Sequence, residues 1–103
     1  MERVKYFLDF MKYARDVKEI LTEHMSDFEV YVFGSVVRKE FSPGLSDIDI
    51  AIVSDEFESR EKRMKIYDLL FEKFFDTPFE FHLLTKRRWE FYLKLVGNDY
   101  LPV

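Results

Sequence analysis

Two aspartates separated by a single residue, Asp47 and Asp49, open an apolar run typical of a strand. Side chains alternate between the faces of a strand, so both carboxylates point the same way, about 6.6 Å apart at Cα. Ile48 and Ile50 then point to the opposite face, into a core. Two carboxylates on one face repel each other unless a cation lies between them. Mg²⁺ prefers oxygen ligands and is commonly held by one or two carboxylates together with substrate phosphates. The pair therefore suits a nucleotide–metal site, although an isolated Asp-x-Asp is more often the solvated start of a strand.

A second group of residues suited to phosphate lies upstream, where Gly34 and Ser35 directly follow an apolar strand. Glycine lets backbone N–H groups approach an anion closely, and a helical turn that starts at Ser35 would direct its free N–H groups at the same opening. Arg38, about one turn later, could grip phosphate oxygens with its planar guanidinium. Taken singly, these residues also fit an ordinary turn and a solvated surface arginine.

Together, Gly34 and Ser35, eleven intervening residues and Asp47-Ile48-Asp49 form a combined motif. It resembles the nucleotidyltransferase superfamily of DNA polymerase beta, and more closely the minimal nucleotidyltransferases of archaea and bacteria. The resemblance spans roughly residues 28–84, and the chain length and element order agree over nearly the whole chain. It implies a polymerase-beta-like fold with a small mixed sheet of about three strands.

The resemblance also implies roles for individual residues. Gly34 and Ser35 match the Gly-Ser that holds the nucleotide phosphates, and Arg38 matches an arginine often found three positions after the serine. Asp47 and Asp49 match the metal-binding aspartates, and such sites commonly bind two Mg²⁺ ions with the nucleotide.

Active members of the family carry a third carboxylate on a later strand, and the candidate here is Glu80. It shares a strand face with His82 and could complete the metal site and help to deprotonate the attacking hydroxyl. The family position is often Asp, and some members lack the residue. His82 could hydrogen-bond near the site or serve only the strand. Other basic residues could contact phosphate or simply be solvated: Lys39, Lys86, Arg87 and Arg88.

The elements that must position these residues follow from apolar periodicity, caps and breakers. The sequence predicts helices over residues 2–24, about 60–75 and 86–96, strands over 28–33, 47–53 and 79–84, a short helix or turn and a loop over 35–46, and a tail over 98–103. Ser59 and Thr85 are expected helix N-caps, Gly97 a C-terminal cap, and Ser42-Pro43-Gly44 a bend. This order predicts an α+β, or α/β two-layer, fold: one domain over residues 1–103 with helices packed against a small sheet.

The helix predicted over residues 2–24 has an unusually wide apolar face, because a second stripe containing Tyr6, Phe10 and Tyr13 lies beside the first. The helix could be wedged between two elements of its own domain, or these three aromatics could meet another chain.

Composition narrows the classes of function. With 16 Lys+Arg against 20 Asp+Glu the net charge is −4, which argues against a broadly basic nucleic-acid surface. No apolar run approaches the length of a membrane span, and no signal peptide is visible at the start. The chain has no Cys, in keeping with a cytoplasmic protein, and no Gln and a single Asn, as in many thermophile proteins.

The resemblance therefore implies a Mg²⁺-dependent enzyme that transfers a nucleoside monophosphate, AMP from ATP, to a hydroxyl. Small proteins of this family are commonly paired as antitoxins with HEPN-domain proteins, and some attach AMP to a tyrosine of the toxin. The alternative is a non-catalytic module of the same fold that neutralises its partner by contact. A modifier of a small molecule would need a pocket built across a dimer interface, so a homo-oligomer is a further arrangement to test.

Overall fold

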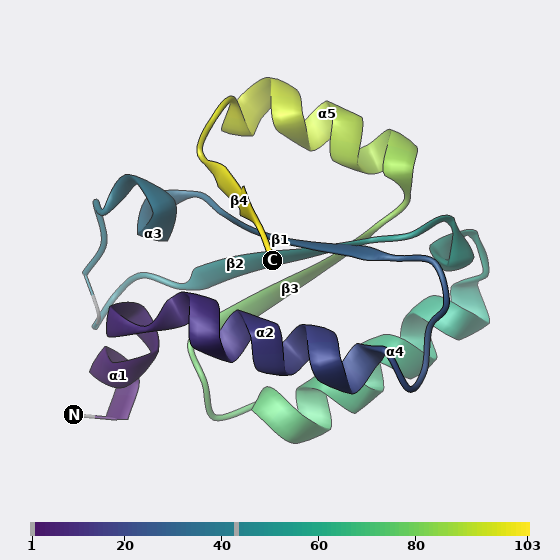
Figure 1. Cartoon of the computed structure of the whole chain (residues 1–103), viewed down its shortest axis with the longest axis horizontal. Coiled ribbons are helices and arrows are strands. Elements are labelled where there is room, and N and C mark those ends of the chain that lie inside the picture. The colour runs from purple at the N-terminus through teal and green to yellow at the C-terminus, as the bar shows by residue number, and fades with distance from the viewer. Residues whose placement is uncertain (1, 43) are drawn as a thin grey trace.

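A computed structural model describes residues 2–42 and 44–103; Pro43, at the centre of the expected bend, lies outside the described residues. A mixed sheet occupies the middle of the molecule, with helices on both faces (Figure 1). Its strand order is β3-β2-β1-β4, so the α+β class and the mixed sheet are confirmed, with four strands instead of about three. The described residues contain no helix that could cross a membrane.

The three longer strands lie where the sequence predicts them. They are β1 (Glu29–Phe33), β2 (Ile48–Val53) and β3 (Phe79–Leu84). β1 runs antiparallel to β2, and β3 runs parallel to β2 with Asp49 directly beside Glu80. The connection between the parallel strands contains a 3-10 turn, η1 (Asp55–Glu58), and a helix, α4 (Arg60–Phe74).

One face of the sheet is covered by α2 (Phe10–Leu21) and α4, which lie below it in Figure 1. Ile48, Ile50 and Ile52 point into this layer and are fully buried, as the alternation of β2 predicts. They pack against Val17 of α2 and Leu70 of α4 in the main core. This apolar layer fixes the register of β2 and so forces Asp49 onto the other face.

The other face of the sheet is covered by α5 (Lys86–Val96), above it in Figure 1. Trp89 is buried in a smaller cluster with Phe33 and Ala51. Tyr31 stacks on Trp89 with ring centroids 4.9 Å apart. Since α5 covers only part of this face, Asp49, Glu80 and His82 lie beside the small core and are not enclosed by it.

The helix caps follow the sequence expectations. Ser59 accepts a hydrogen bond from the Lys62 N–H at 3.2 Å, and Thr85 accepts one from the Arg88 N–H at 3.3 Å. Gly97 ends α5 with φ of 64°, a conformation that favours glycine.

The expected continuous helix over residues 2–24 is wrong in two respects, because it divides at Asp9 into α1 (Glu2–Leu8) and α2, and because α2 ends at Leu21. The break lets Phe7 of α1 bury its ring against Phe41, 4.9 Å away, while α2 follows the sheet. The aromatics of the wide face meet their own chain: Tyr6 packs on Tyr13 and Phe79, with centroids 4.6 and 5.5 Å away. Intramolecular packing therefore accounts for the width of that face.

The tail expected over residues 98–103 contains a fourth strand, β4 (Tyr100–Pro102), antiparallel to β1. The Val103 N–H donates to the Val30 carbonyl at 2.9 Å, and Lys18 of α2 donates to the Val103 carbonyl at 2.7 Å. Three residues that include a proline carry little strand pattern of their own, so β4 depends on the free edge of β1 for its stability.

Candidate functional site

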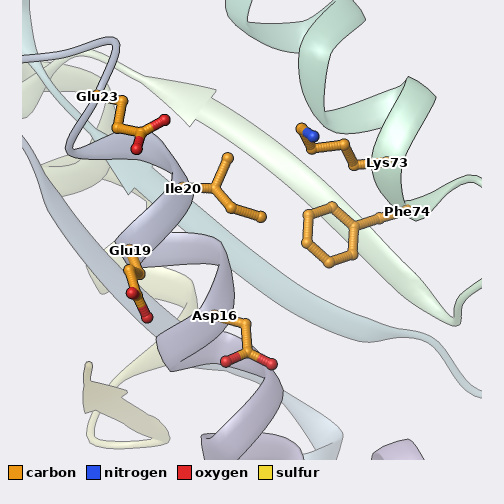
Figure 2. A pocket seen from close by; sticks show the side chains of 6 residues that line it. All are labelled: Asp16, Glu19, Ile20, Glu23, Lys73 and Phe74. Carbon is orange, nitrogen blue, oxygen red and sulfur yellow. The ribbon is translucent and has the colours of Figure 1, made fainter.

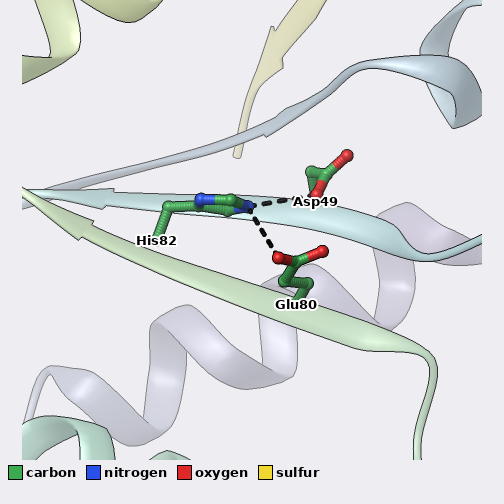
Figure 3. A group of neighbouring side chains, drawn as sticks. All are labelled: Asp49, Glu80 and His82. Carbon is green, nitrogen blue, oxygen red and sulfur yellow. Dashed lines mark hydrogen bonds and ion pairs between the residues drawn. The ribbon is translucent and has the colours of Figure 1, made fainter.

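Asp49, Glu80 and His82 form a cluster on the α5 face of the sheet, at the junction of β2 and β3 (Figure 3). The His82 Nε2 lies 3.1 Å from Asp49 Oδ1 and 4.0 Å from Glu80 Oε1. One ligand atom from each side chain can be chosen so that all lie within 4.8 Å of one another. Asp49 and His82 are partly buried and Glu80 is exposed, so the cluster opens to solvent on the Glu80 side.

His82 is held at both ring nitrogens. Its Nε2 faces Asp49, and its Nδ1 lies 3.4 Å from the Tyr92 hydroxyl of α5. An ionised carboxylate only accepts, so a hydrogen bond to Asp49 requires a proton on Nε2, and a ring with its proton there would accept from Tyr92 at Nδ1. A tyrosine hydroxyl can donate or accept, so Tyr92 could also accept from an Nδ1–H. That second arrangement would free Nε2 as a ligand.

Gly34 lies directly against Asp49. A Cβ built at Gly34 would lie 3.0 Å from Asp49 Oδ2, and the residue has φ of 86°. Phe33, the preceding residue, is paired with Asp49 in the sheet, which explains the close approach. Only glycine meets both conditions without strain. The structure therefore places the glycine corner directly beside Asp49 of the Asp-x-Asp pair.

Ser35 begins the short helix α3 (Ser35–Arg38), as expected. The N–H groups of Val37 and Arg38 bond to the Gly34 carbonyl at 3.1 and 3.3 Å. The first N–H groups of a helix have no partner within the helix itself. The backbone N–H groups of Ser35 and Val36, at the start of α3, are therefore suited to bind an anion.

Asp47 is placed differently from Asp49. It precedes β2, its side chain is 57% exposed, and its Oδ1 lies 3.8 Å from Arg3 Nη2 of α1. Arg3 also donates to the Ser46 carbonyl at 2.6 Å. Among the described residues, the group of side chains close enough to share a metal ion holds Asp49, Glu80 and His82 and does not include Asp47.

Arg38 is held by two carboxylates. Its Nε lies 3.2 Å from Glu40 Oε2, and its Nη1 lies 3.5 Å from Asp99 Oδ2. Asp99 also accepts a hydrogen bond at its backbone oxygen from the Gly34 N–H, at 3.0 Å. The segment before β4 thus fastens both Gly34 and Arg38.

The basic residues at the start of α5 lie elsewhere. Lys86 follows the end of β3, its N–H donates to Asp55 Oδ1 at 3.1 Å, and its Nζ lies 3.6 Å from Asp27 Oδ2. Asp49 and Glu80 lie near the beginnings of their strands, so Lys86 is at the far end of the sheet from the cluster. Arg87 and Arg88 are exposed on the same turn, and Lys39 follows α3.

The donor set fits a divalent cation. Two carboxylates supply the hard oxygen ligands that Mg²⁺ prefers, and solvent access leaves room for waters and phosphate oxygens. The imidazole adds a nitrogen ligand, which suits transition metals better than Mg²⁺. Asp49 and Glu80 would hold such an ion, with His82 either as a third ligand or as the group that orients Asp49.

A separate hollow lies between α2 and α4, lined by Asp16, Glu19, Ile20, Glu23, Lys73 and Phe74 (Figure 2). It is on the opposite face of the sheet from Asp49. Three of its four charged side chains are carboxylates, and they are not among the described groups close enough to share a metal ion, so no shared cation would offset their repulsion of a triphosphate. The Asp49 cluster is therefore the better place for nucleotide chemistry.

Sequence reasoning underrated His82 and missed Tyr92 and Asp99. The alternation of β3 put His82 on the face of Glu80, and that was the one signal available. The parallel register that brings His82 to Asp49, and the packing of α5 that brings in Tyr92, are long-range features. Asp99 enters because β4 pairs with β1.

The nucleotidyltransferase-domain family model matches residues 14–96 of this chain. The match covers most of the chain, including the Gly34 corner, the Asp49 cluster and α5. The chain therefore belongs to the nucleotidyltransferase-domain family. No curated protein matches it.

Two of the solved structures that resemble this chain show the extent of the likeness. One is the crystal structure of a candidate nucleotidyltransferase that is 43% identical; the match covers 88% of this chain and 97% of that chain, with a TM-score of 0.78. The other, from Sulfolobus solfataricus at 1.40 Å, is also described as a candidate nucleotidyltransferase; it is 22% identical over 96% of this chain and 83% of that chain, with a TM-score of 0.68. The second likeness bears on the fold alone. Family and first neighbour together support a transferase that acts on nucleotides.

Proposed function

We propose that this chain, acting as one domain, is a Mg²⁺-dependent enzyme that transfers AMP from ATP to a hydroxyl group. The observation that carries the proposal is the contact of Gly34 with Asp49, beside Glu80 and His82. It brings a backbone corner suited to phosphate against carboxylates suited to a cation. Both are needed to align a nucleotide for attack at its α-phosphorus.

In the proposed reaction, the acceptor hydroxyl oxygen forms a bond to the α-phosphorus as the bond to pyrophosphate breaks. The N–H groups at Ser35 and the Ser35 hydroxyl hold phosphate oxygens, and Arg38 grips the triphosphate after exchanging its carboxylate partners. Glu80, the exposed member of the cluster, takes the hydroxyl proton. A Mg²⁺ pair held by Asp47, Asp49 and Glu80 would neutralise charge on the phosphates. Asp47 would have to leave Arg3 to take part.

We propose that the acceptor is a tyrosine of a HEPN-type toxin, which this chain neutralises as an antitoxin in the cytoplasm. The support is the resemblance to minimal nucleotidyltransferases, together with the openness of the cluster on the Glu80 side, where a side chain of another protein could enter. The alternative is neutralisation by contact alone. The ion pair between Asp47 and Arg3 favours that alternative, because it leaves one expected metal ligand engaged elsewhere.

The test is incubation with α-labelled ATP, Mg²⁺ and a HEPN-type toxin encoded by the adjacent gene. We expect label on a toxin tyrosine, and a loss of at least about a hundredfold in rate for Asp49→Asn. Asp47→Asn is the matched comparison, because the proposal makes Asp47 a metal ligand too and therefore predicts a large loss of rate there as well. A smaller loss of rate for Asp47→Asn than for Asp49→Asn would indicate that Asp49 binds the metal and Asp47 does not.

Toxin binding measured on the same Asp49→Asn variant separates the two functions. Intact binding with lost neutralisation supports the enzyme. Unchanged neutralisation without any label on the toxin contradicts the enzyme and supports the contact module.

A further inference from the structure

We propose that two copies of this chain pair through β3 and α4 in an antiparallel, two-fold symmetric dimer. The inference concerns a surface outside the candidate site and does not depend on the transfer activity. It rests on three features that coincide on one side of the molecule: a free sheet edge, an exposed apolar stripe and a helix whose charge changes sign along its length.

The first feature is the edge strand. Among the described residues, β3 pairs with β2 alone. The Pro78 carbonyl accepts from the Ile48 N–H at 2.8 Å, and the Leu84 carbonyl accepts from the Ser54 N–H at 2.9 Å. Backbone groups of a strand alternate in direction, so even-numbered residues face β2. Phe79, Phe81 and Leu83 therefore direct their N–H and C=O groups outward.

The second feature is an apolar stripe along α4, at intervals of three or four residues. Its members are exposed to the following fractions: Met64 52%, Tyr67 50%, Phe71 60% and Phe75 69%. Two adjoining hollows follow the seam between this stripe and β3, and Tyr67 and Phe81 line both. The stripe and the strand edge thus form one continuous surface. Apolar surfaces of this kind mark interaction sites.

The third feature selects a second copy as the occupant. The N-terminal half of α4 is mainly basic, with Arg60, Lys62, Arg63 and Lys65 against Glu61. Within its own chain, Lys62 Nζ contacts Glu56 and the His24 carbonyl, and Arg63 Nη1 donates to the Phe57 carbonyl. The C-terminal half and the turn after it are mainly acidic, with Asp68, Glu72 and Asp76 against Lys73. An antiparallel copy of α4 would place each basic half beside the partner's acidic half. The surface is therefore complementary to itself under a two-fold rotation.

The strand edge fits the same rotation. With Phe81 facing its own copy across the axis, the outward groups of Phe79 meet those of the partner copy's Leu83, as in a hydrogen-bonded antiparallel pair. β3 itself contains no lysine or proline, the residues that usually guard an edge strand. The result is a continuous eight-stranded sheet with the two α4 helices side by side on one face.

Sedimentation velocity over a wide concentration range tests the proposal. We expect the 12.6 kDa monomer to give way to a species of twice that mass. The Phe71→Asp variant should raise the dimer dissociation constant by at least about tenfold. The matched control is Phe91→Asp, because Phe91 lies on α5 and has 52% exposure. Circular dichroism of both variants should match that of the parent protein, which checks that each is folded.

Two further measurements are specific to this geometry. The Arg60→Glu, Arg63→Glu pair should weaken the dimer, and adding Glu72→Arg and Asp76→Arg should restore it. Amide exchange at Phe81 should slow as the concentration rises. A monomer at every concentration overturns the proposal. The apolar surface would then be assigned to the binding of a different protein. A dimer that Phe91→Asp breaks and Phe71→Asp does not also overturns it.

Discussion

At the scale of single residues, the site depends on a glycine that cannot be replaced without moving Asp49. Gly34 combines φ of 86° with a Cβ position only 3.0 Å from Asp49 Oδ2. Any side chain there must strain the backbone and push the carboxylate away.

We therefore expect Gly34→Ala to lower the free energy of unfolding by roughly 1–3 kcal/mol. Transfer activity should fall further than the lost stability explains, because the carboxylate moves. Denaturant unfolding and initial rates measure the two effects. Gly44→Ala is the control, since a Cβ there meets nothing within 4 Å. Equal effects of the two substitutions would contradict the close approach of Gly34 to Asp49.

His82 gives a second prediction at this scale. A cluster of two carboxylates and one imidazole should bind Zn²⁺ more tightly than Mg²⁺. We expect His82→Gln to weaken Zn²⁺ binding by about tenfold or more and Mg²⁺ binding much less. Calorimetric titration with each metal measures this directly. The same substitution at His24, the other histidine of the chain, is the control. Equal loss for both metals would mean that His82 only orients Asp49.

At the scale of elements, the 3-10 turn η1 is bonded to the loop between α2 and β1. Glu56 Oε2 accepts from the Ser26 and Asp27 N–H groups at 3.2 and 3.0 Å, and Lys62 Nζ lies 3.6 Å from Glu56 Oε1. The backbone N–H of Asp27, opposed by partial burial and helped by Ser26 and Lys62, lowers the pKa of the Glu56 carboxyl below its ordinary value.

A carboxyl whose pKa is lowered by folding contributes stability above its ordinary pKa, and loses it as the pH falls through the folded-state value. Glu56→Gln should therefore reduce the melting midpoint at neutral pH. The two proteins should converge as the pH falls below about 4.5, the ordinary pKa of glutamate. Thermal melts across acid pH check this, with Glu58→Gln on the same turn as the control. A midpoint difference that persists unchanged in acid would contradict the assignment.

The elements also separate what the sequence could predict from what it could not. β1, β2, β3, α4 and α5 carry period-two or helical patterns and recognisable caps, so local rules suffice. The division at Asp9 could not be seen in the sequence because the apolar spacing continues through it. The break is stabilised by the burial of Phe7 against Phe41, a contact that is distant in the chain. β4 is too short to show a pattern. The meeting of His82 with Asp49 follows from strand register, which is not local.

At the scale of the whole molecule, ion pairs connect segments that are distant in the chain. Arg3 reaches Asp47, Arg38 reaches Asp99, and Lys86 reaches Asp27. Exposed pairs of this kind contribute little near 25 °C. Their desolvation cost falls as the temperature rises, so they become more favourable in hot conditions.

We therefore expect a melting midpoint above the roughly 45–65 °C typical of mesophile domains. The absence of Gln and the single Asn point the same way, since amides are thermolabile. Scanning calorimetry at low and high salt measures the midpoint and the share of it that depends on ion pairs. A midpoint within the mesophile range would contradict a thermophilic origin.

The fastening of Gly34 to the segment before β4 has a practical consequence for anyone who handles this protein. The Gly34 N–H donates to the Asp99 carbonyl, and the three residues after Asp99 form β4, which pairs with β1. A fusion or insertion on the C-terminal side of β4 that disturbed its pairing with β1 would therefore also disturb Gly34 and its close approach to Asp49. An assay of such a fusion would show reduced activity even though no residue of the candidate site had been changed.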